Sequence, residues 1–228
     1  MEKIKVAVVG TGNICRSAHM PVYMKRDDVE VIACADIDFP KAKAFAEKFN
    51  IPQVYSSVEE LLANCKPDYV DVCTWPAAHA PVAIAAANAG CHVMCEKPAG
   101  VYTLQVRDMI EEADKHPDLK FGMMFNQRTN CVYRKMREIL QSGELGQIRR
   151  TSWIITNWYR PQSYYDSGAW RATWSGEGGG VLLNQCPHQL DLWQWICGMP
   201  VTMDVKMHFG KWHDIEVEDD VTAYCTYA

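Results

Sequence analysis

Residues 4–15 read IKVAVVGTGNIC, an apolar run that leads into a glycine-containing turn. The run Ile4–Val9 is typical of a buried β-strand, and a helix is predicted to begin shortly after Gly12. In such a turn the first glycine, here Gly10, permits the tight bend, and the second lets the backbone approach a pyrophosphate. The third position, usually glycine or alanine, holds Cys15, which is small enough for helix and strand to pack closely. The stretch therefore predicts a dinucleotide-binding unit at the start of the chain.

The rest of the first half repeats this rhythm of strand and helix. Helices of similar length alternate with short apolar runs, which predicts a parallel sheet covered on both faces. The further strands are expected at Val29–Ala35, Gln53–Tyr55, Tyr69–Cys73, His92–Cys95 and Leu119–Phe125. The predicted fold class is α/β, with a doubly wound Rossmann domain over residues 1–124 that binds NAD(P).

The rhythm changes at about residue 125, and a second domain is predicted over residues 125–228. Its elements mix helices and strands, so we expect an α+β domain. They are a helix at Cys131–Gln141, a long strand at Gln147–Trp158, a helix at Val181–Cys197 that Pro187 bends or delays, and strands at Val201–Phe209 and Val221–Tyr227. The sequence stops at Ala228 inside the last strand, which predicts an incomplete domain and a fragment of a longer chain.

Composition and charge exclude several classes of function. The chain has 228 residues, 48% hydrophobic and 22% charged, with a net charge of −5, as in an ordinary globular protein. No run of lysine and arginine suggests a nucleic-acid partner, and no leader or apolar run of about 20 residues suggests secretion or a membrane span. The ten cysteines include no C-x-x-C pair, which favours reduced, buried thiols in a cytoplasmic protein.

An acidic residue follows the second predicted strand. Asp36 stands where a carboxylate would accept hydrogen bonds from the adenosine ribose of a dinucleotide. A carboxylate there would also repel the 2′-phosphate of NADP, so NAD is favoured over NADP. Asp38 competes for the same role, and either residue could instead cap the next helix.

The tripeptide Glu96-Lys97-Pro98 follows the predicted strand His92–Cys95. This places it at the sheet edge where ligands of open α/β sheets bind. Lys97 is therefore expected to reach a substrate oxygen above the nicotinamide, where its ammonium would stabilise negative charge during hydride transfer. The alternative is an ordinary solvated lysine.

A second candidate stretch, Gly178–Asp191, reads GGGVLLNQCPHQLD. On a helix, Asn184, His188 and Asp191 would share one face because of their spacing. His188 could take a hydroxyl proton as hydride leaves, and Asn184 could orient the substrate or the imidazole. Asp191 is expected to make structural hydrogen bonds. The alternative for His188 is a hydrogen-bonded histidine of the core.

Aromatic and charged residues mingle between residues 158 and 174. Sugar rings stack on aromatic side chains and their hydroxyls bond to charged groups, so this stretch suits a sugar ligand. We expect Tyr164, Trp170 and Arg171 to contact the substrate. The same residue types dominate subunit interfaces, so an interface is the alternative.

Four segments, in this order and spacing, resemble the glucose-fructose oxidoreductase and inositol dehydrogenase (Gfo/Idh/MocA) family. They are residues 6–14 (VAVVGTGNI), 73–79 (CTWPAAH), 93–98 (VMCEKP) and Gly178–Asp191. The resemblance extends over essentially the whole chain. It implies an N-terminal Rossmann domain and a C-terminal domain with an open, mainly antiparallel sheet for substrate binding and oligomerisation. It also implies hydride transfer between NAD(P) and a sugar or cyclitol, in a homodimer or homotetramer of longer chains.

The resemblance assigns roles residue by residue. It implies that Lys97 and His188 are catalytic. Asn184 stands where many members have aspartate, and its amide can still form hydrogen bonds. Pro76 and His79 are kept, whereas Ala77 replaces a common asparagine. The expected cofactor contacts are Gly10, Gly12, Asn13, Ile14, Asp36, Thr74, Pro76, His79, Glu96 and Lys97, and the expected substrate contacts are Lys97, Tyr164, Trp170, Arg171, Asn184 and His188.

The leading prediction is an NAD-dependent dehydrogenase or reductase that acts on a secondary alcohol of a sugar, glycoside or cyclitol. Two alternatives stay open: a redox-assisted glycosidase or epimerase that retains NAD, and a non-catalytic NAD-binding sensor. No metal site is expected, because His208 and His213 lie among acidic residues without a known ligand spacing.

Overall fold

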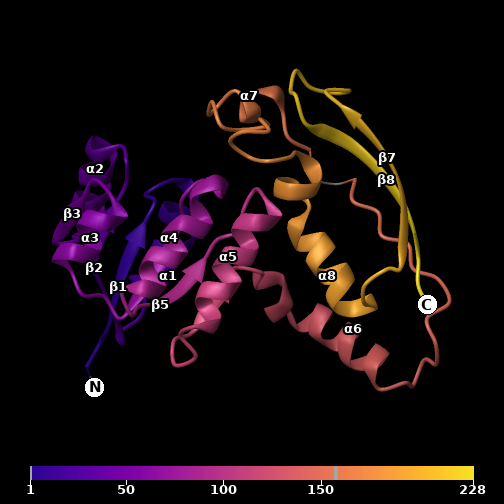
Figure 1. The fold of residues 1–228 in the computed structure, drawn as a ribbon, viewed down its shortest axis with the longest axis horizontal. Helices are drawn as coiled ribbons and strands as arrows, with labels where there is room; N and C mark the ends of the chain where they lie inside the picture. The colour runs from indigo at the N-terminus through magenta and orange to yellow at the C-terminus, as the bar shows by residue number, and fades with distance from the viewer. Residues whose placement is uncertain (1, 157–158) are drawn as a thin grey trace. The chain divides into compact units, whose positions relative to one another are not determined.

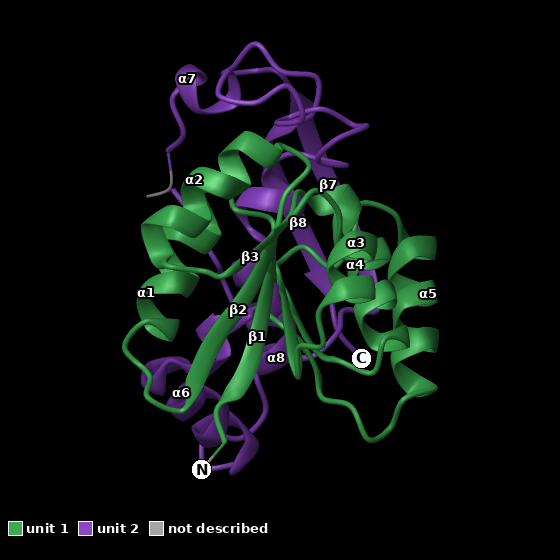
Figure 2. Ribbon diagram, turned by 90° about the vertical axis from the view of Figure 1, so that its left-hand side faces the viewer, with its two compact units in different colours: residues 1–124 green, residues 125–228 purple. Residues whose placement is uncertain are grey.

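The computed structural model describes residues 2–156 and 159–228. The chain divides into two compact units, residues 1–124 and residues 125–228, which are coloured separately in Figure 2. In the described residues, no helix combines the length and the apolar character needed to cross a membrane.

The first unit is built on a six-stranded parallel sheet (Figure 1). In spatial order its strands are β3 (Gln53–Tyr55), β2 (Val29–Ala35), β1 (Ile4–Val9), β4 (Tyr69–Val72), β5 (His92–Cys95) and β6 (Phe121–Met123). This is the doubly wound order of a Rossmann fold. The predicted fold class of the first half is therefore confirmed.

Helices cover both faces of this sheet, as Figure 2 shows. The first face carries η1 (Cys15–His19), α1 (Met20–Tyr23) and α2 (Phe39–Phe49), and the second carries α3 (Val58–Asn64), α4 (Pro76–Asn88) and α5 (Thr103–Asp114). Alternate residues of β1 enter the two cores: Val6 and Val8 pack with the first set of helices, Ala7 and Val9 with the second. Burial on both faces explains why the strands read as nearly continuous apolar runs.

The parallel sheet gathers the candidate residues of the first half at one edge. The strand order reverses between β1 and β4, and ligands of open α/β sheets bind at the carboxyl ends of the strands beside such a reversal. Gly10 follows β1, Asp36 follows β2, Thr74 lies just beyond β4, and Lys97 lies just beyond β5. The fold therefore places all four at the same sheet edge.

The second unit combines helices with an antiparallel hairpin (Figure 1). Its elements are η2 (Asn126–Thr129), α6 (Cys131–Gln141), α7 (Gln162–Tyr165), η3 (Val181–Gln185), α8 (Pro187–Cys197), β7 (Thr202–Phe209) and β8 (Glu218–Thr226). The α+β composition predicted for the second half is confirmed. The predicted helix over Val181–Cys197 is interrupted at Cys186. Pro187 is the first residue of α8, a position where the missing backbone N–H of proline costs no helical hydrogen bond.

The long strand predicted at Gln147–Trp158 is wrong over the residues that the structure describes. Residues 147–156 form no strand, and residues 157–158 lie outside the described part. A β-strand exists only where a neighbour takes up its backbone hydrogen bonds, and β7 and β8 pair with each other instead. The apolar run alone was therefore not enough to make a strand.

Candidate functional site

The glycine turn after β1 has the geometry that a phosphate-binding turn needs. Gly10 has a φ of +94°, and a Cβ there would lie 2.5 Å from the carbonyl oxygen of Cys73. A side chain at this position is excluded by both backbone conformation and space. At Gly12 a Cβ would meet nothing within 4 Å, so the backbone borders open space. Cys15 is fully buried in the core beneath the turn, where close packing of helix and strand requires a small side chain.

Asp36 holds the glycine turn in place. Its Oδ2 atom accepts hydrogen bonds from the backbone N–H and the hydroxyl of Thr11, each at 2.8 Å, and from Nζ of Lys41 at 2.8 Å. Its Oδ1 atom accepts the N–H of Asp38 at 3.0 Å. Burial alone would raise the pKa of Asp36, but these hydrogen bonds outweigh burial and lower it. Asp38 instead caps α2 by accepting the N–H of Lys41 at 3.2 Å.

The segment after β4 is fixed by His79. This side chain is 1% exposed, and its Nδ1 and Nε2 atoms lie 2.5 Å from the Pro98 carbonyl oxygen and 3.0 Å from that of Thr74. His79 therefore ties the loop after β4 to the loop after β5, and it supports the ligand edge from beneath. Pro76 opens α4 at its first residue. The Thr74 hydroxyl is buried and has no hydrogen-bond partner among the described residues.

The predicted catalytic lysine follows a buried acid. Glu96 is 7% exposed, and its Oε2 atom accepts the backbone N–H of Lys97 at 3.1 Å. Its Oε1 atom lies 2.8 Å from Nε2 of His19. Burial alone would raise the pKa of Glu96, but the hydrogen bond and charge of His19 outweigh it, so the pKa is lowered. Glu96 is thus a charged anchor of the loop that carries Lys97.

The sequence interpretation missed His19, the partner of this anchor, and Asp71, which contacts the other nitrogen of the His19 ring. Asp71 lies in β4 with no exposed surface, and His19 Nδ1 lies 2.7 Å from its Oδ2 atom. One feature of the sequence could have revealed the pair: a lone acid inside the apolar run YVDV, which a buried strand tolerates only with a partner.

In the second unit the three residues of the Gly178–Asp191 stretch have separate surroundings. The Asn184 amide donates to the carboxylate of Glu177, an acid with no exposed surface. His188 is half-buried, and its ring meets the Phe125 ring edge-on at a centroid distance of 6.2 Å. Asp191 accepts two hydrogen bonds from the guanidinium of Arg128, at 2.5 and 2.8 Å. Asp191 therefore has the structural role that the sequence suggests.

Two buried acids that the sequence interpretation did not single out support this stretch. Glu177 accepts the backbone N–H of Ala172 at 2.7 Å as well as the Asn184 amide. Glu218 accepts the backbone N–H groups of Gly180 and Leu182, at 2.9 and 3.0 Å. Glu218 therefore accepts two backbone N–H groups at the start of η3, where a helix leaves such groups unpaired, and Glu177 holds the side chain of Asn184 within η3.

The aromatic residues that were predicted to contact substrate form one cluster. The Arg171 guanidinium carbon lies 4.3 Å from the Tyr164 ring centroid and 4.4 Å from that of Trp170. Arg171 also donates to the Tyr164 hydroxyl at 2.7 Å. Gln185, next to Asn184, donates to the same hydroxyl at 3.3 Å and accepts from Arg160 at 3.0 Å. The predicted trio is thus brought together and joined to the Asn184 segment.

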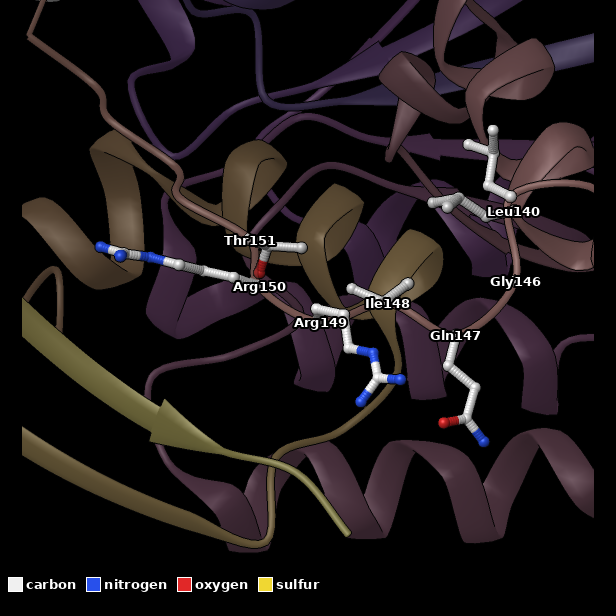
Figure 3. A pocket seen from close by; sticks show the side chains of 8 residues that line it. Leu140, Gly146, Gln147, Ile148, Arg149, Arg150 and Thr151 are labelled. Carbon is white, nitrogen blue, oxygen red and sulfur yellow. The ribbon is translucent and has the colours of Figure 1, made fainter.

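Two cavities of about 370 Å³ each lie in the second unit. One lies beside the aromatic stretch, and its lining includes Tyr159, Arg160, Tyr165, Gln185, Trp212 and His213. The other lies between Leu140 of α6 and the segment 145–151, and Figure 3 shows its lining side chains, of which that of Arg150 extends away from Leu140. Neither lining includes a residue predicted to contact substrate, but Tyr165 and Gln185 of the first cavity are the chain neighbours of Tyr164 and Asn184.

Comparison with known protein families gives two matches. The NAD-binding Rossmann fold of the GFO_IDH_MocA oxidoreductase family matches residues 4–123, and the family's C-terminal domain matches residues 133–228. The chain belongs to the Gfo/Idh/MocA oxidoreductase family. The resemblance carried by the sequence motifs is thereby confirmed, as is an NAD-binding Rossmann fold in the first unit.

Relatives and solved structures agree with this family. D-glucoside 3-dehydrogenase of Escherichia coli is 31% identical in an alignment of 224 positions that covers 92% of this chain and 62% of that protein. Myo-inositol 2-dehydrogenase of Thermotoga maritima is 27% identical over 201 residues, 87% of this chain and 56% of that protein. The WlbA dehydrogenase of Chromobacterium violaceum, solved with NADH and UDP-GlcNAcA, is 29% identical, with a TM-score of 0.89 over 100% of this chain and 64% of that one.

These Gfo/Idh/MocA relatives are longer than the chain described here. The chain spans less than two thirds of the length of each of the three. The two matched domains nevertheless coincide closely with the two compact units, because the boundary at residues 124 and 125 falls between the two matched ranges.

Proposed function

We propose that this chain carries the cofactor site and part of the substrate site of an NAD-dependent dehydrogenase or reductase. The proposed substrate is a secondary alcohol, or the matching ketone, of a sugar, glycoside or cyclitol. One observation carries the proposal: the open turn at Gly12, the ionised Asp36 and the anchored Lys97 loop all lie at the carboxyl edge of one Rossmann sheet.

The residues present fit a dinucleotide. A Cβ at Gly12 would meet nothing within 4 Å, which leaves space for a pyrophosphate, and the helix begins at Asn13 and Ile14, where backbone N–H groups have no preceding turn to bond to. The unpartnered Thr74 hydroxyl can bond to a ligand at the same edge. Asp36 Oδ1 accepts one N–H at 3.0 Å and keeps a lone pair for a ribose hydroxyl. Its negative charge disfavours a 2′-phosphate, so we propose NAD rather than NADP.

The bound nicotinamide would accept or supply the hydride. The chain's own residues then handle charge and protons. The Lys97 ammonium donates a hydrogen bond to the reacting oxygen and stabilises its negative charge. The His188 imidazole takes the hydroxyl proton during oxidation and returns it during reduction. The Asn184 amide, held by Glu177, orients the groups around that imidazole.

We assign substrate binding to the second unit. The Tyr164, Trp170 and Arg171 cluster presents ring faces and hydrogen-bonding groups together, the combination that sugars require. The neighbouring cavity is about 370 Å³, within the size range of small-molecule sites. Relatives named for a glucoside and for myo-inositol support a polyhydroxylated ring as substrate. A homodimer or homotetramer remains our expectation for the assembly.

The proposal is tested by incubating the purified protein with NAD and a panel of glycosides, nucleotide sugars and cyclitols. NADH and product are measured together. NADH that accumulates with one substrate class supports the proposal and names the class. Product without NADH would identify the redox-assisted glycosidase or epimerase, and bound NAD without any product would point to a sensor.

Matched variants test the catalytic assignments. Lys97→Met and His188→Ala should each lower turnover by about 100-fold or more while NAD still binds. Lys115→Met is the control, because Lys115 pairs with Glu112 on the surface of α5 and its side chain is 65% exposed. Retained turnover in both active-site variants would refute the assignments.

A further inference from the structure

An acid lies inside the Rossmann core. Asp71 belongs to β4, whose Val70 and Val72 enter the core beneath α3 and α4, whereas Asp71 faces the opposite side of the sheet. It has no exposed surface. A buried carboxylate without a partner is costly, so a partner must come from the helices on that side.

His19, at the end of η1, lies between two carboxylates. Its Nδ1 atom is 2.7 Å from Asp71 Oδ2, and its Nε2 atom is 2.8 Å from Glu96 Oε1. Carboxylate oxygens accept, and a neutral imidazole can donate from only one nitrogen. Both contacts are therefore hydrogen bonds only when the ring is protonated. Burial alone would lower the pKa of His19, but the bonds to Asp71 and Glu96 outweigh it and raise the pKa to about 10.

The hydrogen bonds continue in both directions from His19. On one side the Tyr23 hydroxyl donates to Asp71 Oδ2 at 2.8 Å. On the other side Glu96, held through Oε1 by His19, accepts the backbone N–H of Lys97 through Oε2 at 3.1 Å. A continuous chain of contacts thus runs from the first helix, through the sheet, to the backbone of the proposed catalytic lysine.

We propose that His19 is a positioning residue for Lys97: a buried imidazolium, clamped by Asp71 and Glu96, fixes the Glu96 carboxylate and with it the backbone that presents the Lys97 ammonium. The inference rests on the proposed role of Lys97. His19 itself is 8% exposed, with both ring nitrogens engaged by protein groups, so it acts through Glu96 and is no proton donor to substrate. Precise placement matters because a shift of about 1 Å can cost about 100-fold in rate.

A metal site is a weaker interpretation of the same cluster. Ligand atoms of His19, Asp71 and Cys73 lie within 4.8 Å of one another. Metal binding needs a thiolate and a free imidazole nitrogen. Contact with Cys15 and burial raise the pKa of the Cys73 thiol well above its usual range, and both His19 nitrogens face carboxylates. The hydrogen-bonded clamp therefore accounts for this cluster better than an ion does.

The first test measures the charge of His19 directly in the wild-type chain. With histidine side chains labelled for NMR, His19 should keep the shifts of an imidazolium across neutral pH, because its pKa lies near 10. The surrounding titratable groups are Asp71 on β4, Glu96 after β5, Cys73 after β4 and, through Asp71, Tyr23 on α1. A His19 that titrates near its ordinary value of 6.5 overturns the proposal. This NMR measurement requires neither substrate nor turnover.

The second test uses His19→Gln, with His116→Gln on the surface after α5 as the matched control. In His19→Gln, kcat should fall by about 10- to 100-fold, with KM and the Kd for NAD changed much less, because Lys97 is misplaced rather than removed. Hydrogen exchange at the Lys97 amide should speed up by about tenfold as its bond to Glu96 loosens. A merely structural histidine would lower the melting temperature and leave kcat per folded molecule and this amide unchanged.

The outcomes separate this inference from the proposed function. If His19→Gln folds and its Lys97 amide stays protected, the positioning role is wrong whatever the turnover. If Lys97→Met keeps full activity while the amide responds to His19→Gln, the clamp stands and the catalytic role of Lys97 fails. If His19→Gln does not fold, Glu96→Gln replaces it, because it keeps the side-chain shape, removes one carboxylate charge and should produce the same loss of kcat.

Discussion

The Asp36 carboxylate binds both the backbone N–H and the side-chain hydroxyl of Thr11, at 2.8 Å each. Thr11 lies between the two glycines of the phosphate-binding turn. One carboxylate therefore shapes the turn expected to hold the pyrophosphate and lies at the position expected to hold the ribose. Cofactor affinity and cofactor choice should both depend on this side chain.

Asp36→Asn should weaken NAD binding by about tenfold, which corresponds to about 1.4 kcal/mol. The amide keeps the shape of the side chain but replaces an acceptor and its charge with a donor. Loss of the charge also removes repulsion of a 2′-phosphate, so the ratio of NADP to NAD affinity should rise. Both affinities can be measured by calorimetry.

Asp38→Asn is the matched control because it removes the same charge two residues away. Asp38 caps α2, and asparagine caps helices about as well as aspartate. Stability and NAD affinity should therefore stay close to those of the wild type. Equal losses in both variants would mean that Asp36 acts only through general charge.

The two glycines of the turn should respond differently to alanine. Gly10→Ala forces a side chain into a backbone with φ +94° and to within 2.5 Å of the Cys73 carbonyl oxygen, so we expect a loss of about 1–3 kcal/mol or more in unfolding free energy. Gly12→Ala meets nothing within 4 Å and should fold normally. Because the methyl group would occupy the space assigned to the pyrophosphate, NAD affinity should nevertheless fall.

Denaturant unfolding and NAD titration of both variants check this contrast. A Gly12→Ala protein that is stable and still binds NAD as tightly as the wild type would remove the pyrophosphate from that space. Gly10→Ala should therefore lower the free energy of unfolding, whereas Gly12→Ala should lower NAD affinity and leave the free energy of unfolding unchanged.

Arg171→Ala should raise KM about tenfold or more with a smaller effect on kcat. The guanidinium lies against the Tyr164 and Trp170 rings and donates to the Tyr164 hydroxyl, so its removal both deletes a polar contact and loosens the ring faces. Lys135→Ala, which removes a cation 62% exposed on α6, should leave KM unchanged. Unchanged kinetics in Arg171→Ala would instead favour a subunit interface for this cluster.

The sequence predicted the ligand edge of the first unit because the position of each residue at that edge depends only on the strand that comes just before it. Gly10 and Asp36 follow an apolar run directly and Lys97 follows one after a single residue, and parallel strands that alternate with helices end at the same side of a sheet. The contacts inside the core were beyond such reasoning. His19 and Asp71 are 52 residues apart, and their pairing depends on how η1 packs on β4.

In the second unit, the sequence was less able to predict where strands and helices form. The run at Gln147–Trp158 has the composition of a strand, yet strand formation depends on a neighbour that composition does not reveal. The predicted shared face of Asn184, His188 and Asp191 likewise required regular helix on both sides of Pro187, where the sequence predicted only a bend or a late start. In the structure Asn184 lies in η3, before the interruption at Cys186, and its carboxylate partner is Glu177, seven residues earlier in the chain.

The clamp around His19 makes a prediction about stability and pH. The pKa of His19 is raised from 6.5 to about 10 in the folded chain, where burial opposes and the Asp71 and Glu96 hydrogen bonds favour the proton. A group whose folded pKa lies above its unfolded value stabilises the fold fully below the unfolded pKa. That contribution is lost as pH rises through the folded pKa. The difference in unfolding free energy between wild type and His19→Gln should therefore be greatest below pH 6.5 and shrink steadily towards pH 10.

Urea unfolding at a series of pH values measures this difference. The surface variant His116→Gln should differ from the wild type by a small amount that does not follow the same course, because His116 lies outside the clamp and its side chain is 30% exposed. A wild-type advantage over His19→Gln that stays flat, or grows with rising pH, would mean that the folded chain holds a neutral imidazole. Glu96 would then lack the cationic partner that fixes it, and the Lys97 loop would depend on other contacts for its position.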